Sequence, residues 1–249
     1  MKNLFMAVAT LLMVCSSCSA TSPRSKQLTV KGKFDGISVA NNIEVVYTPA
    51  SNVSISVKAS DKGMSCLKME VKNGTLHFKA PDARNEEIKI TMTAPDLKSI
   101  TAVNNAEVKV TKTLTVSSAK ITATNNGEIE LNGGINANDV SISATNNGEI
   151  SLPSLYAVKA AISTTNNAEL KCKKVEVTDI KCTATNNSEI DIAGHGVTVN
   201  FTATNNAEID AADFQAGSGK ATATNLATIK ANVDNLTTST TNMAKIYNK

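Results

Sequence analysis

Apolar and polar residues alternate along much of the chain, in short runs that end or begin at a pair of asparagines. The run 140–144 (Val-Ser-Ile-Ser-Ala) precedes one such pair, and the run 149–152 (Glu-Ile-Ser-Leu) follows it. Alternation with a period of two is typical of a β-strand that has one buried face. The pattern therefore predicts many short strands and little helix.

The segment around each asparagine pair returns at a nearly constant interval. Close copies of Ala-Thr-Asn-Asn-Gly-Glu-Ile stand at 123–129, 144–150, 164–170, 184–190 and 203–209, with looser copies at 40–45, 102–108, 223–229 and 240–246. An isolated hairpin would also suit Asn-Asn-Gly, because Asn and Gly tolerate left-handed backbone, but it does not explain a fixed return. We therefore predict an all-β solenoid with coils of ~20 residues, each about 4.8 Å further along the axis.

Aligning the coils on the first Asn gives columns of uniform chemistry. Positions four before, four after and six after this Asn are apolar, and we expect them to fill the core; examples are Ile121, Ile129 and Leu131. Alternating pairs such as Val175 and Val177 predict a third side for each coil. The interval from Asn41 to Asn104 is three times the usual one, which leaves room for two degenerate coils.

The first asparagine of each pair forms a column for which we predict a structural role. Stacked identical amides can hydrogen-bond along the axis, and we expect this ladder to satisfy polar groups at an inward corner. Its members are Asn104, Asn125, Asn146, Asn166, Asn186, Asn205, Asn225 and Asn242.

A column of glutamates lies three residues after this asparagine and is expected on the outer face. Neighbouring carboxylates about 5 Å apart in water repel by about 0.8 kcal/mol before screening. The column is interpreted as a solvated face, with a weak divalent-cation or ligand site as the alternative. The candidate binding face comprises Glu107, Glu128, Glu149, Glu169, Glu189 and Glu208, and Glu44 holds the corresponding early position.

The first twenty residues have the order of a secretory signal. Lys2 precedes an apolar run at 4–14, and small residues follow it up to Ala20. The run is shorter than the roughly 20 residues that a membrane-spanning helix needs. Ser16 and Ser17 before Cys18 resemble a lipobox, so we predict lipidation of Cys18, with plain cleavage after Ala20 as the alternative.

These signals predict the domain organisation and the cellular localisation. We expect a lipoprotein-type signal peptide at 1–18, a tether at 19–32 and a β-helix domain at 33–249 that is less regular at 33–100. The protein would be exported and held on the outer membrane by its lipid anchor, on the periplasmic side or at the cell surface.

Composition and chemistry exclude several functions. Lys and Arg number 25 against 22 Asp and Glu, with Arg only at Arg24 and Arg84, so no basic nucleic-acid surface is expected. Cys66, Cys172 and Cys182 show no metal or disulfide spacing and are read as small apolar residues, although a bridge between the last two stays open.

No catalytic signature stands out. His77 and His195 occur once each in unrelated contexts, and Gly194-His195-Gly196 is read as a surface turn. The repeated glutamates have near-identical surroundings, whereas a catalytic acid and base need different ones. We expect no enzyme activity, no cofactor and no metal site.

Several motifs that are individually of low specificity occur in the same order as in one family. The segment 34–45 (Phe-Asp-Gly-Ile-Ser-Val-Ala-Asn-Asn-Ile-Glu-Val), the turn at Asn73-Gly74, the segment 94–100 (Ala-Pro-Asp-Leu-Lys-Ser-Ile) and the coils that follow resemble the head GIN domain family, the putative auto-transporter adhesins of Bacteroidetes. The resemblance covers roughly 33–229. It implies a right-handed parallel β-helix on an exported or lipidated envelope protein with an adhesive role, and it supplies no catalytic residues.

The resulting hypothesis is a non-catalytic cell-envelope β-solenoid that serves as an adhesin or a structural module, with a glycan or a protein as ligand. The alternative is a polysaccharide-binding or polysaccharide-cleaving protein that uses the acidic face. Near the end of the chain the second Asn of the pair becomes Leu226 and then Met243. This change predicts an altered end of the solenoid and end-to-end self-association there.

Overall fold

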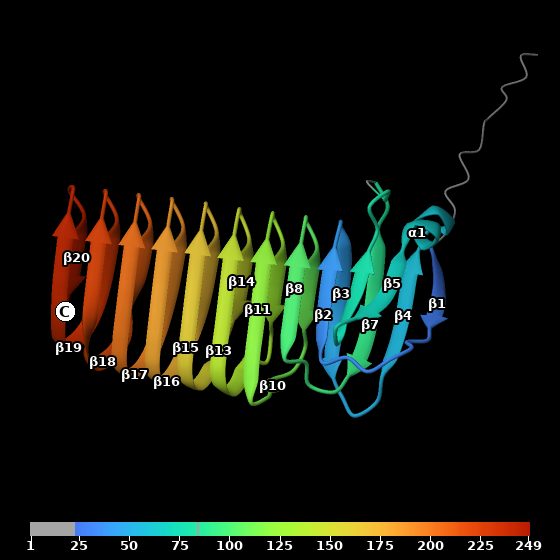
Figure 1. Ribbon diagram of the computed structural model, residues 1–249, viewed down its shortest axis with the longest axis horizontal. Helices are drawn as coiled ribbons and strands as arrows, with labels where there is room; N and C mark the ends of the chain where they lie inside the picture. The colour runs from blue at the N-terminus through green and yellow to red at the C-terminus, as the bar shows by residue number, and fades with distance from the viewer. Residues whose placement is uncertain (1–22, 84) are drawn as a thin grey trace, which may run out of the picture.

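The computed structural model describes residues 23–83 and 85–249 of the 249-residue chain. These residues form a β-solenoid of about eight turns, in which strands lie side by side along one long axis (Figure 1). The prediction of an all-β solenoid is confirmed. The predicted signal peptide, including Cys18, lies outside the described residues.

The regular part of the solenoid runs from residue 99 to the C-terminal strand. Its strands are β8 (Ser99–Val103), β9 (Glu107–Val110), β10 (Leu114–Thr115), β11 (Ser118–Thr124), β12 (Glu128–Leu131), β13 (Ile135–Thr145), β14 (Glu149–Leu152), β15 (Leu155–Thr165), β16 (Glu169–Thr185), β17 (Glu189–Thr204), β18 (Glu208–Thr224), β19 (Thr228–Thr241) and β20 (Lys245–Asn248). Each pairs in parallel with a strand one coil away, so that Ile121 pairs with Ile142 and Ile142 with Ile162.

Each coil has three sides around a narrow core. Along β16 every second residue is buried, but two consecutive residues face outward after Cys172 and again after Val177. These two bends and the asparagine corner divide the coil into three short sides. The predicted apolar columns are buried, as Ile121, Ile129 and Leu131 show with no exposed surface. Burying each large aliphatic side chain contributes roughly 1.5–3 kcal/mol, so regular stacking of modest residues can hold the rod together.

The two cysteines of the regular coils belong to this core. Cys172 stacks between Leu152 and Ile192, whereas Cys182 stacks between Ile162 and Phe201 in a different column. Both are free thiols, so the bridge left open by the sequence does not form. Burial raises the pKa of Cys172 to about 12 and raises that of Cys182 as well, which makes both unreactive.

The asparagine pair turns the chain sharply between two sides of the coil. At Asn125 and Asn126 the φ angles are 53° and 59°, and the Gly127 N–H donates to the Thr124 carbonyl over 3.1 Å. Two consecutive residues with positive φ define a type I′ turn, and Asn tolerates this region better than most residues do. Asparagine is therefore needed at these positions chiefly for the left-handed backbone conformation of the turn.

The asparagine side chains lie on the outside of this corner, so the expected inward orientation is wrong. Asn104, Asn125 and Asn146 are exposed, whereas the small residue after each pair, such as Ala106, is buried. The left-handed turn carries the two amides away from the core and returns the chain inward only at the following residue.

The exposed amides bond to one another along the axis. Each Nδ2 donates to the Oδ1 of the asparagine one coil nearer the N terminus, over 2.7–3.1 Å, and the bonds link Asn104, Asn125, Asn146, Asn166, Asn186, Asn205, Asn225 and Asn242 without interruption. The second asparagine of each pair makes similar bonds, for example from Asn126 to Asn105 over 2.9 Å. Water competes for such groups, so each bond contributes at the low end of the usual 0.5–1.5 kcal/mol.

One buried polar pair interrupts two columns of alanine. Thr164 replaces the alanine found at Ala144 and Ala184, and Ser188 replaces the one found at Ala168 and Ala207. The Thr164 hydroxyl donates to Ser188 Oγ over 3.0 Å, and Ser188 Oγ donates to the Thr164 carbonyl over 3.0 Å. Ser188 Oγ also accepts from the backbone N–H of Thr185 over 2.9 Å. The two departures from the repeat satisfy each other, as buried hydroxyls must.

The N-terminal part does not contain the two degenerate coils expected between Asn41 and Asn104. Strand β2 (Gly36–Ala40) pairs in parallel with β8 on one side and with β6 (Thr75–Lys79) on the other. Strand β3 (Ile43–Pro49) likewise lies between β9 and β7 (Ile88–Ala94). The coil of Asn41 therefore stacks directly on the coil of Asn104, and the intervening residues fold onto its opposite side.

Antiparallel strands close this N-terminal end. Strand β4 (Ser54–Ala59) pairs antiparallel with β7 and with β1 (Arg24–Leu28), which lies in the segment predicted as a tether. Strand β5 (Lys68–Lys72) forms the predicted Asn73-Gly74 hairpin with β6, and the short helix α1 (Asp61–Cys66) follows β4. These antiparallel pairs end the parallel stacking, because a further coil cannot continue across them in register.

The C-terminal end has no comparable cover within the part of the chain that the structure describes. Strand β20 pairs only with residues 228–231 of β19, and the rest of β19 pairs only with β18. Leu226, Met243 and Tyr247 are 54%, 77% and 55% exposed there. The two ends of the solenoid therefore differ: one is closed by antiparallel strands and the other presents open strands (Figure 1).

We expect the asparagine amides to add stability beyond their turn-forming role. The variant Asn146→Gly keeps a residue that accepts positive φ but loses two side-chain bonds, so the free energy of unfolding should fall by about 1 kcal/mol. The matched control is Leu226→Gly, where a branched residue at φ 66° is relieved and stability should rise. Urea unfolding measures both. Equal effects of the two variants would assign the asparagines to backbone conformation alone.

Candidate functional site

The six glutamates of the predicted binding face form one continuous line. They open strands β9, β12, β14, β16, β17 and β18 at the corner that follows the asparagine pair, and they are in register from coil to coil; the acidic column consists of Glu107, Glu128, Glu149, Glu169, Glu189 and Glu208. Glu44 continues it through its pairing with Glu107. In-register stacking alone brings these residues together from over 100 residues of chain.

Lysines neutralise part of the acidic column. Lys109 pairs with Glu107 and Lys171 with Glu169, each from two residues further along the same strand. Lys230 contacts Glu208 and Asp210, both over 2.8 Å. The spacing Glu-x-Lys, which places both side chains on one face of a strand, is the signal that identifies the first two pairs.

Two of the glutamates that lack a lysine partner, Glu128 and Glu189, have raised pKa values. Burial raises the pKa of Glu128, and the charges of Glu107 and Glu149 on the adjacent coils raise it further. The pKa of Glu189 is raised in the same way, by burial and then by Glu169, against the opposing effect of Lys171. Neither glutamate has a salt-bridge lysine among the described residues. The column is thus a row of like charges that is only partly compensated.

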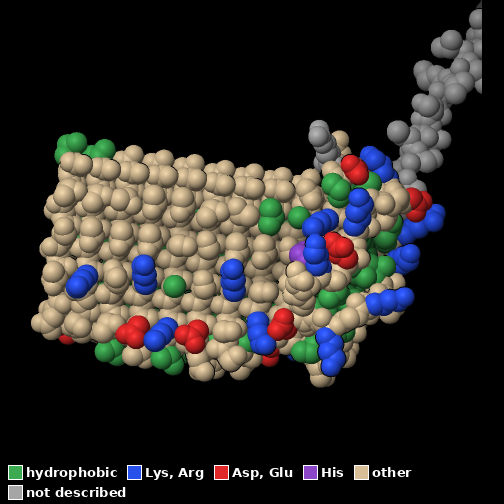
Figure 2. Space-filling view, in the orientation of Figure 1, with side chains coloured by type: hydrophobic (Ala, Val, Ile, Leu, Met, Phe, Trp, Pro, Cys, Tyr) green, Lys and Arg blue, Asp and Glu red, His purple; other side chains and the backbone are tan. Residues whose placement is uncertain are grey.

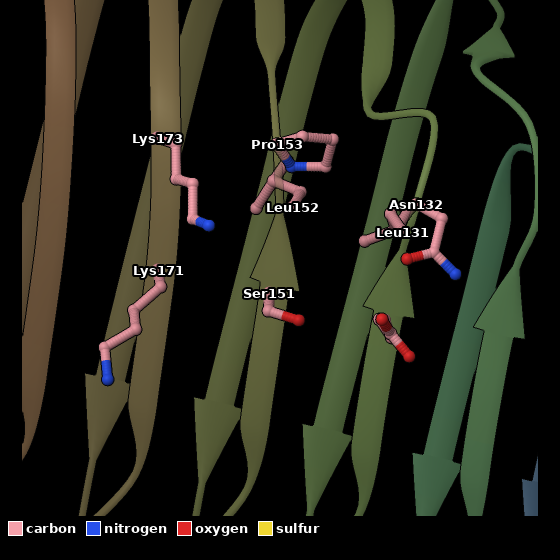
Figure 3. A pocket seen from close by; sticks show the side chains of 8 residues that line it. Leu131, Asn132, Ser151, Leu152, Pro153, Lys171 and Lys173 are labelled. Atoms are coloured by element: carbon pink, nitrogen blue, oxygen red, sulfur yellow. The ribbon is translucent and has the colours of Figure 1, made fainter.

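A shallow hollow lies beside the acidic column (Figure 3). Its volume is about 240 Å³, and its lining comes from three successive coils: Glu130, Leu131, Asn132, Ser151, Leu152, Pro153, Lys171 and Lys173. Ligand pockets usually enclose ≈ 300–1,000 Å³. With one carboxylate and two lysines, the hollow can hold a small polar group but offers no acid and base in contrasting environments.

Other residues considered from the sequence lie apart from this face or serve packing. His195 belongs to strand β17, where it pairs with Glu176 and Gln215, so its assignment to a surface turn is wrong. Its flanking glycines allow close approach: a Cβ at Gly196 would lie 2.7 Å from the Phe214 ring. His77 belongs to β6 in the N-terminal part.

The described residues offer neither a metal site nor a membrane-spanning helix. Across residues 23–83 and 85–249, no group of three or more His, Cys, Asp or Glu side chains is placed to hold a metal ion. Over the same ranges, no helix is both long enough and apolar enough to cross a membrane.

We expect Glu128→Gln to stabilise the protein by about 0.5 kcal/mol at pH 7, because it removes a solvent-screened charge that burial and two neighbours disfavour. The raised pKa means that the folded chain binds the Glu128 proton more tightly than the unfolded chain, so this residue costs stability as the pH rises. The gain should therefore vanish well below about pH 4, where the residue is protonated in both states.

Thermal unfolding at pH 7 and pH 3 tests this expectation. The control is Glu169→Gln, which removes the partner of Lys171 and should bring no gain. An equal gain from both substitutions would contradict the assigned role of the lysines.

The comparisons with known proteins agree with this architecture. Residues 33–157 match the family described as "Putative auto-transporter adhesin, head GIN domain". None of the curated proteins matches the sequence.

Several solved structures share the fold at low sequence identity. A putative adhesin from Parabacteroides merdae has a TM-score of 0.84 at 15% identity, covering 92% of this chain and 97% of its own. A putative adhesin from Parabacteroides distasonis has a TM-score of 0.79 at 16% identity, covering 92% and 95%. A putative lipid binding protein from the same species has a TM-score of 0.65 at 16% identity, covering 92% and 98%.

The structural likeness extends beyond the matched segment to most of the chain. At this level of sequence identity it shows a shared fold and nothing further. The sequence match covers half of the chain and includes strands β2 to β7 and the first regular coils. The chain therefore belongs to the head GIN domain family of putative auto-transporter adhesins.

Proposed function

We propose that this protein is a non-catalytic adhesive module of the cell envelope. The observation that carries the proposal is the combination of family membership with a long solenoid whose outer faces repeat the same side chains coil after coil. Solenoids present extended surfaces and use them to bind long or repetitive partners. Such a surface suits contact with a polymer or another cell surface better than the enclosure of a small substrate.

The polysaccharide-cleaving alternative gains no support. A glycosidase needs one carboxyl group that is protonated and one that is ionised, in contrasting surroundings. Glu128 and Glu189 both have raised pKa values from the same two causes, burial and neighbouring glutamates. These two glutamates therefore share one environment and do not form a contrasting acid and base with each other.

Localisation in the cell envelope would support the adhesive role. This localisation is proposed from the signal-like N-terminal sequence and from family membership. The proposed lipid anchor at Cys18 precedes strand β1 by six residues, which span at most about 20 Å when extended. Strand β1 belongs to the closed N-terminal end, and strand β20 lies at the opposite end (Figure 1). An anchored chain would therefore hold its closed end near the membrane and present its open end outward.

The open end favours a second candidate function, end-to-end association with another copy. Unpaired strand edges and exposed apolar side chains together form a template for further pairing. Strand β20 and the second half of β19 supply the edge, and Leu226 and Met243 supply apolar surface at the asparagine corner. In the other coils these positions carry asparagine.

The adhesive role predicts saturable binding of the purified chain to at least one extracellular-matrix protein or glycan, measured on arrays with and without calcium. The variant with both Glu149→Gln and Glu169→Gln separates the two readings of the acidic column. Retained binding would make the column a solvated face, and lost binding would make it the ligand site. A chain that binds no surface component in either condition would contradict the proposal.

The open end predicts association that grows with protein concentration, measured by light scattering and analytical ultracentrifugation. The variant with Leu226→Asn and Met243→Asn should remain monomeric, because it restores the polar corner of the other coils. Val158 and Val197 are 48% and 58% exposed and lie on strands away from that corner. The matched control replaces both of these valines by Asn. Monomeric wild-type protein at high concentration, or equal association of all three proteins, would contradict the idea.

A further inference from the structure

Three shallow hollows follow one another along a face of the solenoid. Their volumes are about 360, 310 and 480 Å³. Lys159 and Ala160 line both the first and the second hollow, and Val199 and Asn200 line both the second and the third. The hollows are therefore parts of one groove that runs from Lys98 at one end to Thr237 at the other.

The groove follows one bend of the coil, on strands β11, β13, β15, β16, β17, β18 and β19. Its floor is the column six residues before the first Asn of each pair, where Val140, Ala160 and Ile180 are only 3–5% exposed. The columns on either side of this floor are outward-facing and form its walls. Six steps between seven stacked strands give a length of about 29 Å.

The walls of the groove carry an excess of positive charge. Five lysines and two aspartates line it: Lys98, Lys120, Lys159, Lys181, Lys220, Asp139 and Asp179. Figure 2 shows lysines spaced in a row across the regular coils, with a second row along the lower edge in which acidic and basic side chains alternate. In the wall column five residues before the asparagine, Lys120, Lys181 and Lys220 are separated by three coils and two coils, about 14 and 10 Å.

These lysines differ from those of the acidic column. Lys120, Lys159, Lys181 and Lys220 form no salt bridge with any described residue, whereas Lys109, Lys171 and Lys230 are each paired with a glutamate. The carboxyl group of Asp179 accepts a hydrogen bond from the Thr198 hydroxyl rather than from a lysine. Lys98 is paired with Asp35 over 3.0 Å, and Lys159 lies in register between Asp139 and Asp179. The charges of Lys120, Lys181 and Lys220 are therefore the ones available to a ligand, whereas the lysines beside the acidic column are already paired.

We propose that this groove, the lysine groove, binds a linear acidic polysaccharide along the solenoid axis. The inference rests on the adhesive function and names its ligand class and surface. An extended chain of uronate or sulfated sugars would place anionic groups at intervals along the row of lysines. Wall residues such as Ser141, Asn200 and Ser218 supply hydroxyl and amide groups that can bond to sugar hydroxyls.

The lining favours an acidic polysaccharide over other polymers. Among the described residues of the groove, none is aromatic and none is Arg. Single-stranded nucleic acids are usually held by aromatic side chains that stack on the bases, and Arg is preferred for phosphate. Neutral sugars would find hydrogen bonds here but no ring to stack on, so charge is the feature that selects the ligand.

The test measures binding of the full chain to alginate and to heparin, with neutral dextran and single-stranded oligo(dT) as comparison ligands. The groove variant carries Lys120→Ser, Lys181→Asn and Lys220→Thr. The same column already carries Ser141, Asn200 and Thr237, so these substitutions suit the fold. The control variant carries Lys58→Ser, Lys79→Ser and Lys112→Ser, which remove the same charge from exposed positions outside the groove and away from the acidic column.

We expect the wild-type chain and the control variant to bind at least one acidic polysaccharide with similar affinity. The groove variant should bind it ~10-fold more weakly or worse, since it loses three ion pairs of about 0.5 kcal/mol each. Wild-type binding should weaken as salt is raised, because salt screens the attraction between exposed lysines and an anionic ligand. Dextran should not bind.

Three outcomes would overturn the proposal. They are the absence of binding to both acidic polysaccharides, an equal loss in the groove and control variants, and tighter binding of oligo(dT) than of either polysaccharide. The same proteins on the surface arrays separate this failure from failure of the adhesive function. If wild-type and groove variant adhere equally, the groove proposal fails and the adhesive function stands; if the wild-type chain adheres to nothing, the adhesive function fails.

Discussion

The left-handed turn at each asparagine pair is the constraint on which the rest of the solenoid depends. Two consecutive residues with positive φ reverse the direction of the chain within one step, and each turn bonds through its backbone to the turn above it, for example from the Asn126 N–H to the Asn146 carbonyl over 3.0 Å. Because the turn occurs once per coil, it sets the register of every strand on both sides of it. Asparagine meets this need without the loss of side-chain contacts that glycine would bring.

Exact register has a benefit and a cost. It places Ile121, Ile142 and Ile162 on one another in the core, so that small and medium side chains fill a narrow interior. It also places Glu128 between two other glutamates, which raises its pKa. Lysines at intervals, and the matched pair Thr164 and Ser188 in the core, show that departures from the repeat occur where the repeat itself would be unfavourable or where two departures satisfy each other.

The same stacking that gives long uniform faces also creates a problem at the ends, because the last coil on each side leaves a strand edge without a partner. At the N-terminal end β6 and β7 lie on the coil of Asn41, and the chain folds back antiparallel on them, with β5 pairing with β6 and β4 with β7. At the C-terminal end the apolar residues Leu226 and Met243 replace asparagine at the exposed corner. The closed end, the open end and the two charged faces give the rod four distinct surfaces from one repeated unit.

Local and periodic features were readable from the sequence. The strands, the buried columns and the Asn73-Gly74 hairpin follow from alternation and turn chemistry, which depend on neighbours in the chain. The stacking of the Asn41 coil on the Asn104 coil and the strand at His195 were decided by tertiary structure, since each depends on which coil lies next to which. The outward direction of the asparagine amides follows from the left-handed turn itself. The lysine groove was not predicted from the sequence, because its walls mix Lys, Ser, Asn and Thr and form no uniform column. The recurrence of lysine at 120, 181 and 220 in one column is the one signal of it in the sequence. Sequence by itself determined the repeat and its core, because burial and turn preference act residue by residue; only the stacked structure decided the surfaces, because a face is made of residues that the chain keeps about 20 positions apart.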